Sequence, residues 1–344
     1  MEERVLHGVN LTGWLTLQSW VTPEMFAGTG SLGEQGVLDT LGVELYQDLI
    51  NEHRQTFITE EDFKLIARRG FNAVRLPVPW YAFGKQGPDP GPYVGCIDNL
   101  DEAFDWAERH NIAILLVLDI SPGAQGEISI ATSGHSRREE VLDVLAALSR
   151  RYVAADALFG VEVAYEPLAQ RRKGLFGITD GVPLHALRNY YREAYEAVRT
   201  GGGERPCVVL PDAGLPRAWR SFMARQRYTN VWLDCHLYHY TDQVDATGPA
   251  GAAALVRRSR QTLEEASKSG LPVMVGAWSA ALPFADSLMT PEGRIALERV
   301  YCSEQIAAFE ERPAWFFQTW KTNGHLSGWD SRVALASFER GMLG

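Results

Sequence analysis

The sequence is poor in the features that mark disulfide scaffolds, metal sites and membrane spans. Its 344 residues include only four cysteines, which lie far apart, with no C-x-x-C motif and no histidine at ligand spacing. We therefore expect reduced, mostly buried thiols and no metal site. No apolar run approaches about 18 residues. The start, MEERVLHGVN, has no basic stretch followed by an apolar one, so we expect no signal peptide and a cytoplasmic protein.

Positive charge and interdomain linkers are also scarce. The 33 Lys and Arg residues face 43 Asp and Glu residues, for a formal net charge of −10. This balance argues against nonspecific binding to nucleic acid or anionic membranes and favours a neutral or small-molecule ligand. Two Pro- and Gly-rich stretches, 85–95 and 199–206, are short and flanked by periodic segments, so we predict loops there. We expect one domain over residues 1–344, and the sequence does not indicate its oligomeric state.

Strand-like and helix-like segments alternate along the chain. Short apolar runs that end at polar or Gly/Pro turns predict strands near 5–10, 72–78, 112–119, 158–164, 207–211, 230–236, 272–276 and 314–319. Amphipathic periodicity predicts helices at 99–111, 138–152, 184–199 and 254–270, the last with Gly270 as a C-cap. Eight such strands predict a single-domain (β/α)8 TIM barrel. A doubly wound sheet is less favoured, because the first strand is not followed by a G-x-G-x-x-G turn.

Six motifs in a fixed order carry a family resemblance. They are GVNLTGWLTLQSWVTPEMF, VRLPVPWYAF, VEVAYEP, LDCHLYHY, VGAWSAAL and WFFQTWKTNG, and they span roughly residues 5–335. In this order they resemble glycoside hydrolase family 5, and most closely its exo-β-1,3-glucanase-like branch. The resemblance implies a metal-free β-glycosidase that needs no cofactor and acts on a carbohydrate or glycoside.

The resemblance also implies a catalytic machinery. In that family one Glu, in an Asn-Glu-Pro motif after the fourth strand, is the acid/base, and a second Glu after the seventh strand is the nucleophile. Such retaining enzymes hold the two carboxyl groups about 5–5.5 Å apart. Glu166, which precedes Pro167, matches the acid/base. His236 and Tyr238 match residues that orient the carboxylates and the sugar, and Arg75 matches an arginine near the nucleophile.

The most important departure from the family pattern is Ala277, which stands where the nucleophile is expected. A methyl group cannot attack an anomeric carbon, so the chain as given is expected to be inactive or severely impaired. The intact surroundings VMVG-WSAAL fit an inactivating replacement of Glu in an otherwise active enzyme. A natural noncatalytic protein would also lack the residue, so both explanations stay open.

Four further departures indicate divergence of the sugar-binding subsite. Tyr165 replaces the family Asn that bonds the sugar 2-hydroxyl, and Asp119 aligns with a family His. Gln18 replaces a Glu that holds sugar hydroxyls, and Gln318 replaces a Trp that stacks on the sugar ring. Unpaired buried polar groups cost roughly 1–3 kcal/mol each, so we expect a modified sugar or an unusual glycoside rather than a simple β-1,3-glucan oligosaccharide.

Aromatic side chains near the expected barrel mouth are candidates for sugar contacts, because sugars pack their C–H faces on aromatic rings. Of these we select Trp80 and Trp320 as substrate-binding residues. Three functions follow from the sequence. The first is a retaining β-glycosidase of unusual specificity. The second is a carbohydrate-binding pseudoenzyme, and the third is a transglycosylase.

Overall fold

The computed structural model describes residues 5–120, 135–173, 177–225, 227–242, 246, 248–283 and 289–336. The strands are β1 (Leu6–Asn10), β2 (Ala73–Pro79), β3 (Ala113–Asp119), β4 (Leu158–Glu162), β5 (Arg172–Lys173), β6 (Gly177–Ile178), β7 (Cys207–Pro211), β8 (Val231–Leu237), β9 (Val273–Trp278) and β10 (Ala314–Phe317). The α-helices are α1 (Glu34–Leu41), α2 (Val43–Thr56), α3 (Glu60–Arg68), α4 (Ile97–His110), α6 (His135–Tyr152), α7 (Leu184–Gly202), α8 (Pro249–Ser267), α10 (Pro291–Phe309) and α11 (Ser331–Ala334). Short 3-10 helices cover η1 (Pro23–Phe26), η2 (Gly84–Gln86) and η3 (Pro216–Trp219).

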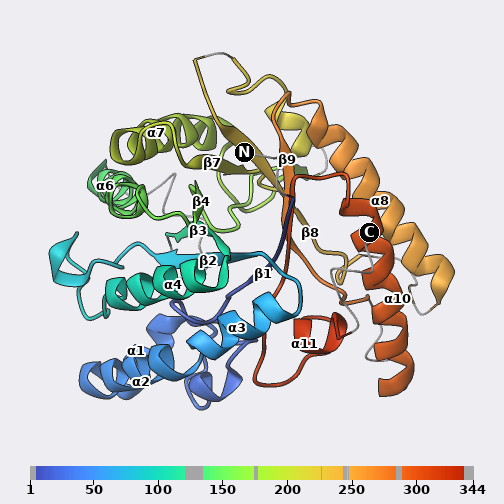
Figure 1. Ribbon diagram of the computed structural model, residues 1–344, viewed down its shortest axis with the longest axis horizontal. Coiled ribbons are helices and arrows are strands. Elements are labelled where there is room, and N and C mark those ends of the chain that lie inside the picture. The colour runs from blue at the N-terminus through green and yellow to red at the C-terminus, as the bar shows by residue number, and fades with distance from the viewer. Residues whose placement is uncertain are drawn as a thin grey trace.

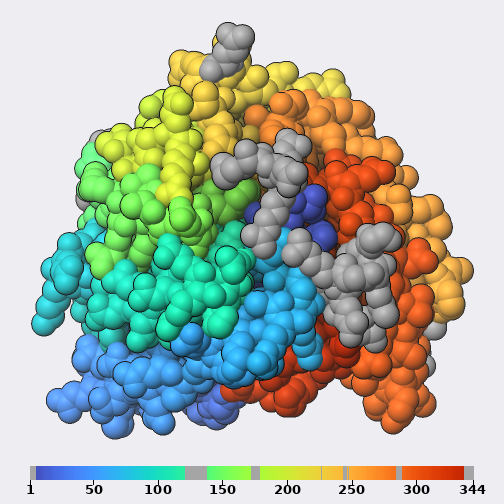
Figure 2. Space-filling model, in the orientation of Figure 1, coloured from blue at the N-terminus to red at the C-terminus, as the bar shows by residue number. Residues whose placement is uncertain are grey.

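Eight parallel strands close into a barrel in the order β1-β10-β9-β8-β7-β4-β3-β2, and the helices surround it (Figure 1). The predicted (β/α)8 fold is confirmed. β1 closes the ring by pairing with both β2 and β10. In the space-filling view, dark blue atoms from the start of the chain accordingly lie between light blue and red segments (Figure 2). A separate two-stranded antiparallel ribbon, β5–β6, follows β4.

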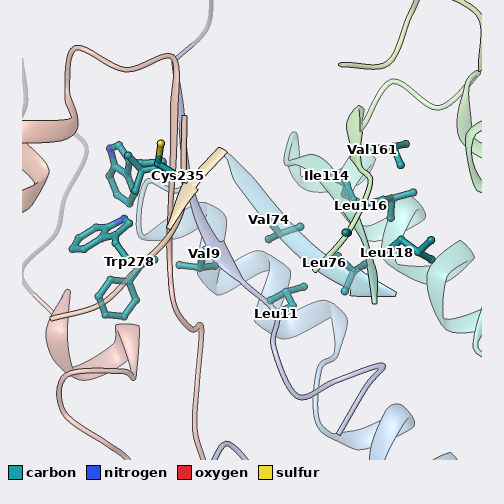
Figure 3. Packing of buried hydrophobic residues seen from close by; sticks show 14 of the residues in the cluster. Val9, Leu11, Val74, Leu76, Ile114, Leu116, Leu118, Val161, Cys235 and Trp278 are labelled. Atoms are coloured by element: carbon teal, nitrogen blue, oxygen red, sulfur yellow. The ribbon is translucent and has the colours of Figure 1, made fainter. Parts of the chain in front are cut away.

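Alternation along each strand sorts side chains between the barrel interior and the helices. One buried cluster fills the interior with Leu115 and Val117 of β3, Met274 of β9 and Phe316 of β10, among others. The intervening strand residues belong to a larger cluster between the strands and the helices. Figure 3 shows members of it, including Val74 and Leu76 of β2, Ile114, Leu116 and Leu118 of β3, and Trp278 of β9.

The structure confirms all eight predicted barrel strands to within one or two residues at most ends. The four predicted helices are also present, as α4, α6, α7 and α8. Two details were wrong. α8 ends at Ser267 with Lys268 as its C-cap, and Gly270, at a φ of 80°, serves the turn into β9 instead. The predicted loop at 199–206 begins as helix, because α7 continues to Gly202.

The four cysteines, Cys96, Cys207, Cys235 and Cys302, are free and buried, as predicted. Within the described ranges, no helix is both long and apolar enough to cross a bilayer.

Candidate active site

A buried ionic network lies at the centre of the barrel. Arg75 of β2 donates from Nε and Nη2 to the two carboxylate oxygens of Glu162 on β4, both at 2.8 Å. Its Nη1 donates to Asn10 Oδ1 at 2.8 Å, and Asp234 Oδ2 of β8 lies 3.9 Å from Nε. The side chains of Arg75, Glu162 and Asp234 have no solvent exposure. A bidentate arginine therefore compensates two buried carboxylates directly beneath the barrel mouth.

Two carboxylates of the network and the neighbouring His236 have the spacing of metal ligands. Atoms of Glu162, Asp234 and His236 lie within 4.8 Å of one another. The guanidinium of Arg75 already supplies the cation that this group needs, through its two hydrogen bonds to Glu162. We therefore assign the group to ion pairing rather than to metal binding.

Glu166, the predicted acid/base, is held by both predicted partners. His236 Nδ1 lies 3.1 Å from Glu166 Oε1, and the Tyr238 hydroxyl donates to the same oxygen at 2.8 Å. On its other side, His236 Nε2 lies 3.0 Å from Asp234 Oδ2. The Glu166 side chain is 34% exposed and its φ is 43°, in the left-handed region. The carboxylate is thus fixed at the surface of the mouth, where a ligand can reach it.

Charges in this chain of contacts shift the pKa values of both groups. Burial acts to lower the pKa of His236, but the carboxylates of Asp234 and Glu166 outweigh it and raise this pKa to about 10. Burial acts to raise the pKa of Glu166, but the hydrogen bond and charge of His236 and the charge of Arg75 bring it below its ordinary value. At neutral pH, Glu166 is therefore a carboxylate paired with an imidazolium.

This pairing predicts an unusual titration of His236. The ring should remain doubly protonated at pH 8, where an ordinary histidine with a pKa near 6.5 is neutral. The ¹⁵N chemical shifts of both ring nitrogens measure the state directly. A Glu166→Gln variant should lower the pKa of His236, because one of its two anionic partners is gone. Titration of His236 near pH 6.5 in the unmodified chain would contradict the prediction.

A β-bulge in β9 directs residue 277 into the barrel mouth. On one side, Asp234 and His236 of β8 pair with Met274 and Ala277, so a step of two residues along β8 corresponds to a step of three along β9. On the other side, Trp315 and Phe317 of β10 face Val275 and Trp278, with the same offset. Directly paired residues share a face of a sheet. Ala277 therefore lies on the inward face with His236, as expected where a bulge re-aims a side chain beside a site.

The bulge depends on the glycine before Ala277. The backbone N–H of Gly276 donates to Asp234 Oδ1, and its carbonyl accepts from Asn10 Nδ2 at 3.0 Å. A Cβ at residue 276 would come 1.8 Å from Asp234 Oδ2. Only glycine allows the buried carboxylate of Asp234 to lie against β9 here.

Gly276→Ala is accordingly expected to destabilise the protein by about 3 kcal/mol, since overpacking at a buried, hydrogen-bonded site forces backbone shifts. Gly248→Ala is the control, because a Cβ there meets nothing within 4 Å. It should change the unfolding free energy by less than about 1 kcal/mol. Urea titration of both variants measures the difference, and equal effects would contradict the role of Gly276.

Tyr165 extends across the barrel mouth from the end of β4. Its ring lies over the Arg75 guanidinium at 5.4 Å, and Gln318 Nε2 donates to its hydroxyl at 3.4 Å. Gln318 follows β10, which stands opposite β4 in the closed ring. Burial raises the pKa of Tyr165 well above its ordinary range, so its hydroxyl stays protonated and is no substitute nucleophile.

The other predicted substrate-binding residues are Asp119, Gln18, Trp320 and Trp80. Asp119 ends β3 on the same face as the interior residue Val117, and its charge contributes to raising the pKa of Tyr165. Gln18 is partly exposed. Trp320 is 1% exposed and donates from Nε1 to Asp62 of α3 at 2.8 Å, and its sugar contact stays a prediction. Trp80 is also buried, at 7% exposure, and packs edge-on against Tyr81.

An aromatic cluster lies next to Glu166, and Tyr238 is the one member of it that was selected from the sequence. The ring of Trp329 lies 5.2 Å from Trp20, 5.5 Å from Tyr238 and 5.1 Å from Tyr240. Tyr240 is 48% exposed. Sequence reasoning also missed the two carboxylates of the network, Glu162 and Asp234. In the sequence, each could have been recognised as an acidic residue at an inward-facing position of an otherwise apolar strand.

Comparison with known proteins identifies the family. The model of cellulase (glycosyl hydrolase family 5) matches residues 40–287. The chain belongs to glycosyl hydrolase family 5. Probable glucan 1,3-beta-glucosidase A from Emericella nidulans is 30% identical over 377 residues, covering 96% of this chain and 89% of that protein. Glucan 1,3-beta-glucosidase from Schwanniomyces occidentalis is 27% identical and covers 94% of this chain and 84% of its own.

Solved structures share the fold. A rutinosidase from Aspergillus niger superposes with a TM-score of 0.73 at 19% identity, over 95% of this chain and 92% of that one. An endoglucanase from Thermotoga maritima gives a TM-score of 0.61 at 16% identity, over 99% and 96% of the two chains. The match to the family model and the 30% identical relative confirm the family 5 glycoside hydrolase predicted from the six motifs.

Proposed function

We propose that this site is that of a retaining β-glycosidase, with Glu166 as the acid/base and residue 277 at the position of the nucleophile. The observation that carries the proposal is the bulge in β9. It places residue 277 on the inward face beside His236, whose ring also contacts Glu166 at 3.1 Å. A carboxylate at residue 277 would complete the pair that retention requires.

The chain as given lacks both the nucleophile and a protonated general acid. Ala277 provides no nucleophile. Glu166, whose pKa is lowered by His236 and Arg75, has no proton at neutral pH for the leaving oxygen. In the complete site the second carboxylate would raise the pKa of Glu166 by like-charge repulsion. The absence of one carboxylate thus disables the other.

The substrate class follows from the relatives and from the departures. The relatives' names, glucan 1,3-beta-glucosidase, support a β-linked glucoside. Tyr165 and Gln318 stand where the resemblance expects a 2-hydroxyl partner and a stacking Trp. We propose a glycoside with a modified sugar or a large non-sugar group rather than a simple β-1,3-glucan oligosaccharide.

The test is to return a carboxylate to residue 277 while asparagine replaces Tyr165, whose ring crosses the mouth. The double variant Ala277→Glu, Tyr165→Asn should hydrolyse aryl β-glucosides, and ¹H NMR should show the β-anomer as first product. Adding Glu166→Gln should remove turnover of substrates with poor leaving groups. A folded double variant that is inert across aryl and natural β-glycosides would contradict the proposal.

A second candidate is a carbohydrate-binding protein without hydrolysis. Two observations favour it for the chain as given: Ala277 has no solvent exposure, and the pKa of Glu166 is lowered. Glycoside binding by the unmodified chain, together with an inert double variant, would select this candidate. Sugar transfer products formed by an active double variant would indicate a transglycosylase.

A further inference from the structure

The ring of Tyr165 is held across the barrel rather than along one wall. It leaves the chain just after β4 and reaches Gln318, on the opposite side of the ring of strands, at 3.4 Å. The Thr12 side chain, which follows β1, lies beside its hydroxyl. Tyr165 also packs against the apolar side chains of the barrel interior. Contacts on several sides therefore fix both the position and the tilt of this ring.

A buried cation lies over one face of the ring. Arg75, which is fully buried, lies over one face with its guanidinium carbon 5.4 Å from the centroid. Tyr165 is nevertheless partly exposed, whereas Ala277 is 0% and Gln318 is 2% exposed. Tyr165 is therefore more accessible to a ligand than either residue, and residue 277 is shielded from solvent.

We propose that Tyr165 forms the floor of the sugar subsite, a stacking surface for the C–H face of a pyranose ring that at the same time covers residue 277. This rests on the proposed function, because it assigns a ligand surface within the same site. A phenol ring supported from below by a guanidinium is rigid and presents a flat apolar face. The ligand class is a β-linked glucoside held over the ring, beside Glu166.

A stacking role for Tyr165 accounts for two departures from the family pattern, Gln318 and Ala277. Gln318 provides no aromatic face, and its side chain instead anchors the hydroxyl of the ring that supplies one. Ala277 lies on the inward face of β9 beside His236 and has no solvent exposure. A small residue at 277 leaves the proposed position of the ring free, whereas a longer inward side chain would compete with it.

Ligand binding tests the stacking role. We would measure the affinity of the chain for phenyl β-D-glucoside by calorimetry or NMR titration. Tyr165→Phe keeps the ring and should bind within about threefold of the unmodified chain. Tyr165→Leu keeps apolar bulk without a flat ring and should bind about 3–10-fold more weakly. Thermal unfolding of each variant checks that the fold is intact. Equal affinity of the Phe and Leu variants would overturn the stacking role.

Turnover tests the covering role. Ala277→Glu alone should remain at least roughly tenfold less active than Ala277→Glu, Tyr165→Asn, because the ring obstructs the new carboxylate. Ala277→Glu, Tyr165→Phe should resemble the single variant, since the ring and not the hydroxyl is the obstacle. Equal activity of the single and double variants would overturn the covering role and leave the proposed function standing. If the single and double variants were both inert, the proposed function would be contradicted. The affinities of the Tyr165→Phe and Tyr165→Leu variants would still show whether Tyr165 stacks on the sugar.

Discussion

The double variant Ala277→Glu, Tyr165→Asn is expected to hydrolyse 4-nitrophenyl β-glucoside at least roughly 10³-fold faster than the unmodified chain. Covalent catalysis splits one difficult displacement into two easier ones, and no step of it is available to Ala277. The bulge at 276–277 already aims the side chain at the mouth. The rise should therefore appear in kcat, while loss of the Tyr165 ring should raise KM.

A carboxylate at residue 277 should also change the pKa of Glu166. His236 and Arg75 now hold the pKa of Glu166 below its ordinary value, and a second anion nearby should raise it. We expect a pH–rate profile with a basic limb that reports Glu166. Ala277→Gln, Tyr165→Asn is the matched control, because it has the same shape without the charge. It should show neither the turnover nor the raised pKa.

The dependence of turnover on the leaving group distinguishes the role of Glu166 from that of a carboxylate at residue 277. In the active background, Glu166→Gln should reduce turnover of alkyl glucosides roughly 10²–10⁴-fold, the usual range for general acid catalysis. Dinitrophenyl glucosides need little proton donation, so their glycosylation step should lose far less. An equal loss for both substrate types would show that Glu166 is not the general acid.

The fold was predictable because each barrel strand has its own local signal. β3, for example, is a run of aliphatic residues from Ala113 to Leu118 that ends at Asp119, and β7 ends at Pro211. Parallel strands buried on both faces read as continuous apolar runs. Helix periodicity between them completes the (β/α)8 pattern.

The core of the site was only partly predictable. Glu166, His236 and Tyr238 were found because their motif order matches the family, and the structure brings them into contact. Glu162 was missed because its role depends on Arg75, 87 residues earlier in the chain. Nothing local in the sequence couples the two.

Other details of the site depend on contacts that are distant in sequence. Trp320 follows the last barrel strand, and its indole N–H donates to Asp62 of α3. The burial of Ala277 depends on a two-for-three register offset between β8 and β9. Pattern and spacing do not show such an offset, so the burial of Ala277 could not be predicted from the sequence.

Arg75→Met is expected to lower the free energy of unfolding by about 3–5 kcal/mol. The substitution leaves Glu162 and Asp234, both without solvent exposure, and no bidentate cation between them. Glu162 should then take up a proton at neutral pH, since burial raises its pKa to about 7 even with Arg75 present. Urea unfolding at pH 7 measures the loss.

Two further variants show whether the uncompensated charge is the cause. Glu162→Gln added to Arg75→Met removes one of the stranded carboxylates and should recover part of the stability, a coupling that a double-mutant cycle quantifies. Arg151→Met is the surface control, because Arg151 pairs with Asp101 where both side chains are about two-fifths exposed. It should cost at most about 1 kcal/mol, since exposed ion pairs are well solvated. A comparable loss from Arg151→Met, or no recovery from Glu162→Gln, would mean that Arg75 stabilises the barrel through packing rather than through charge.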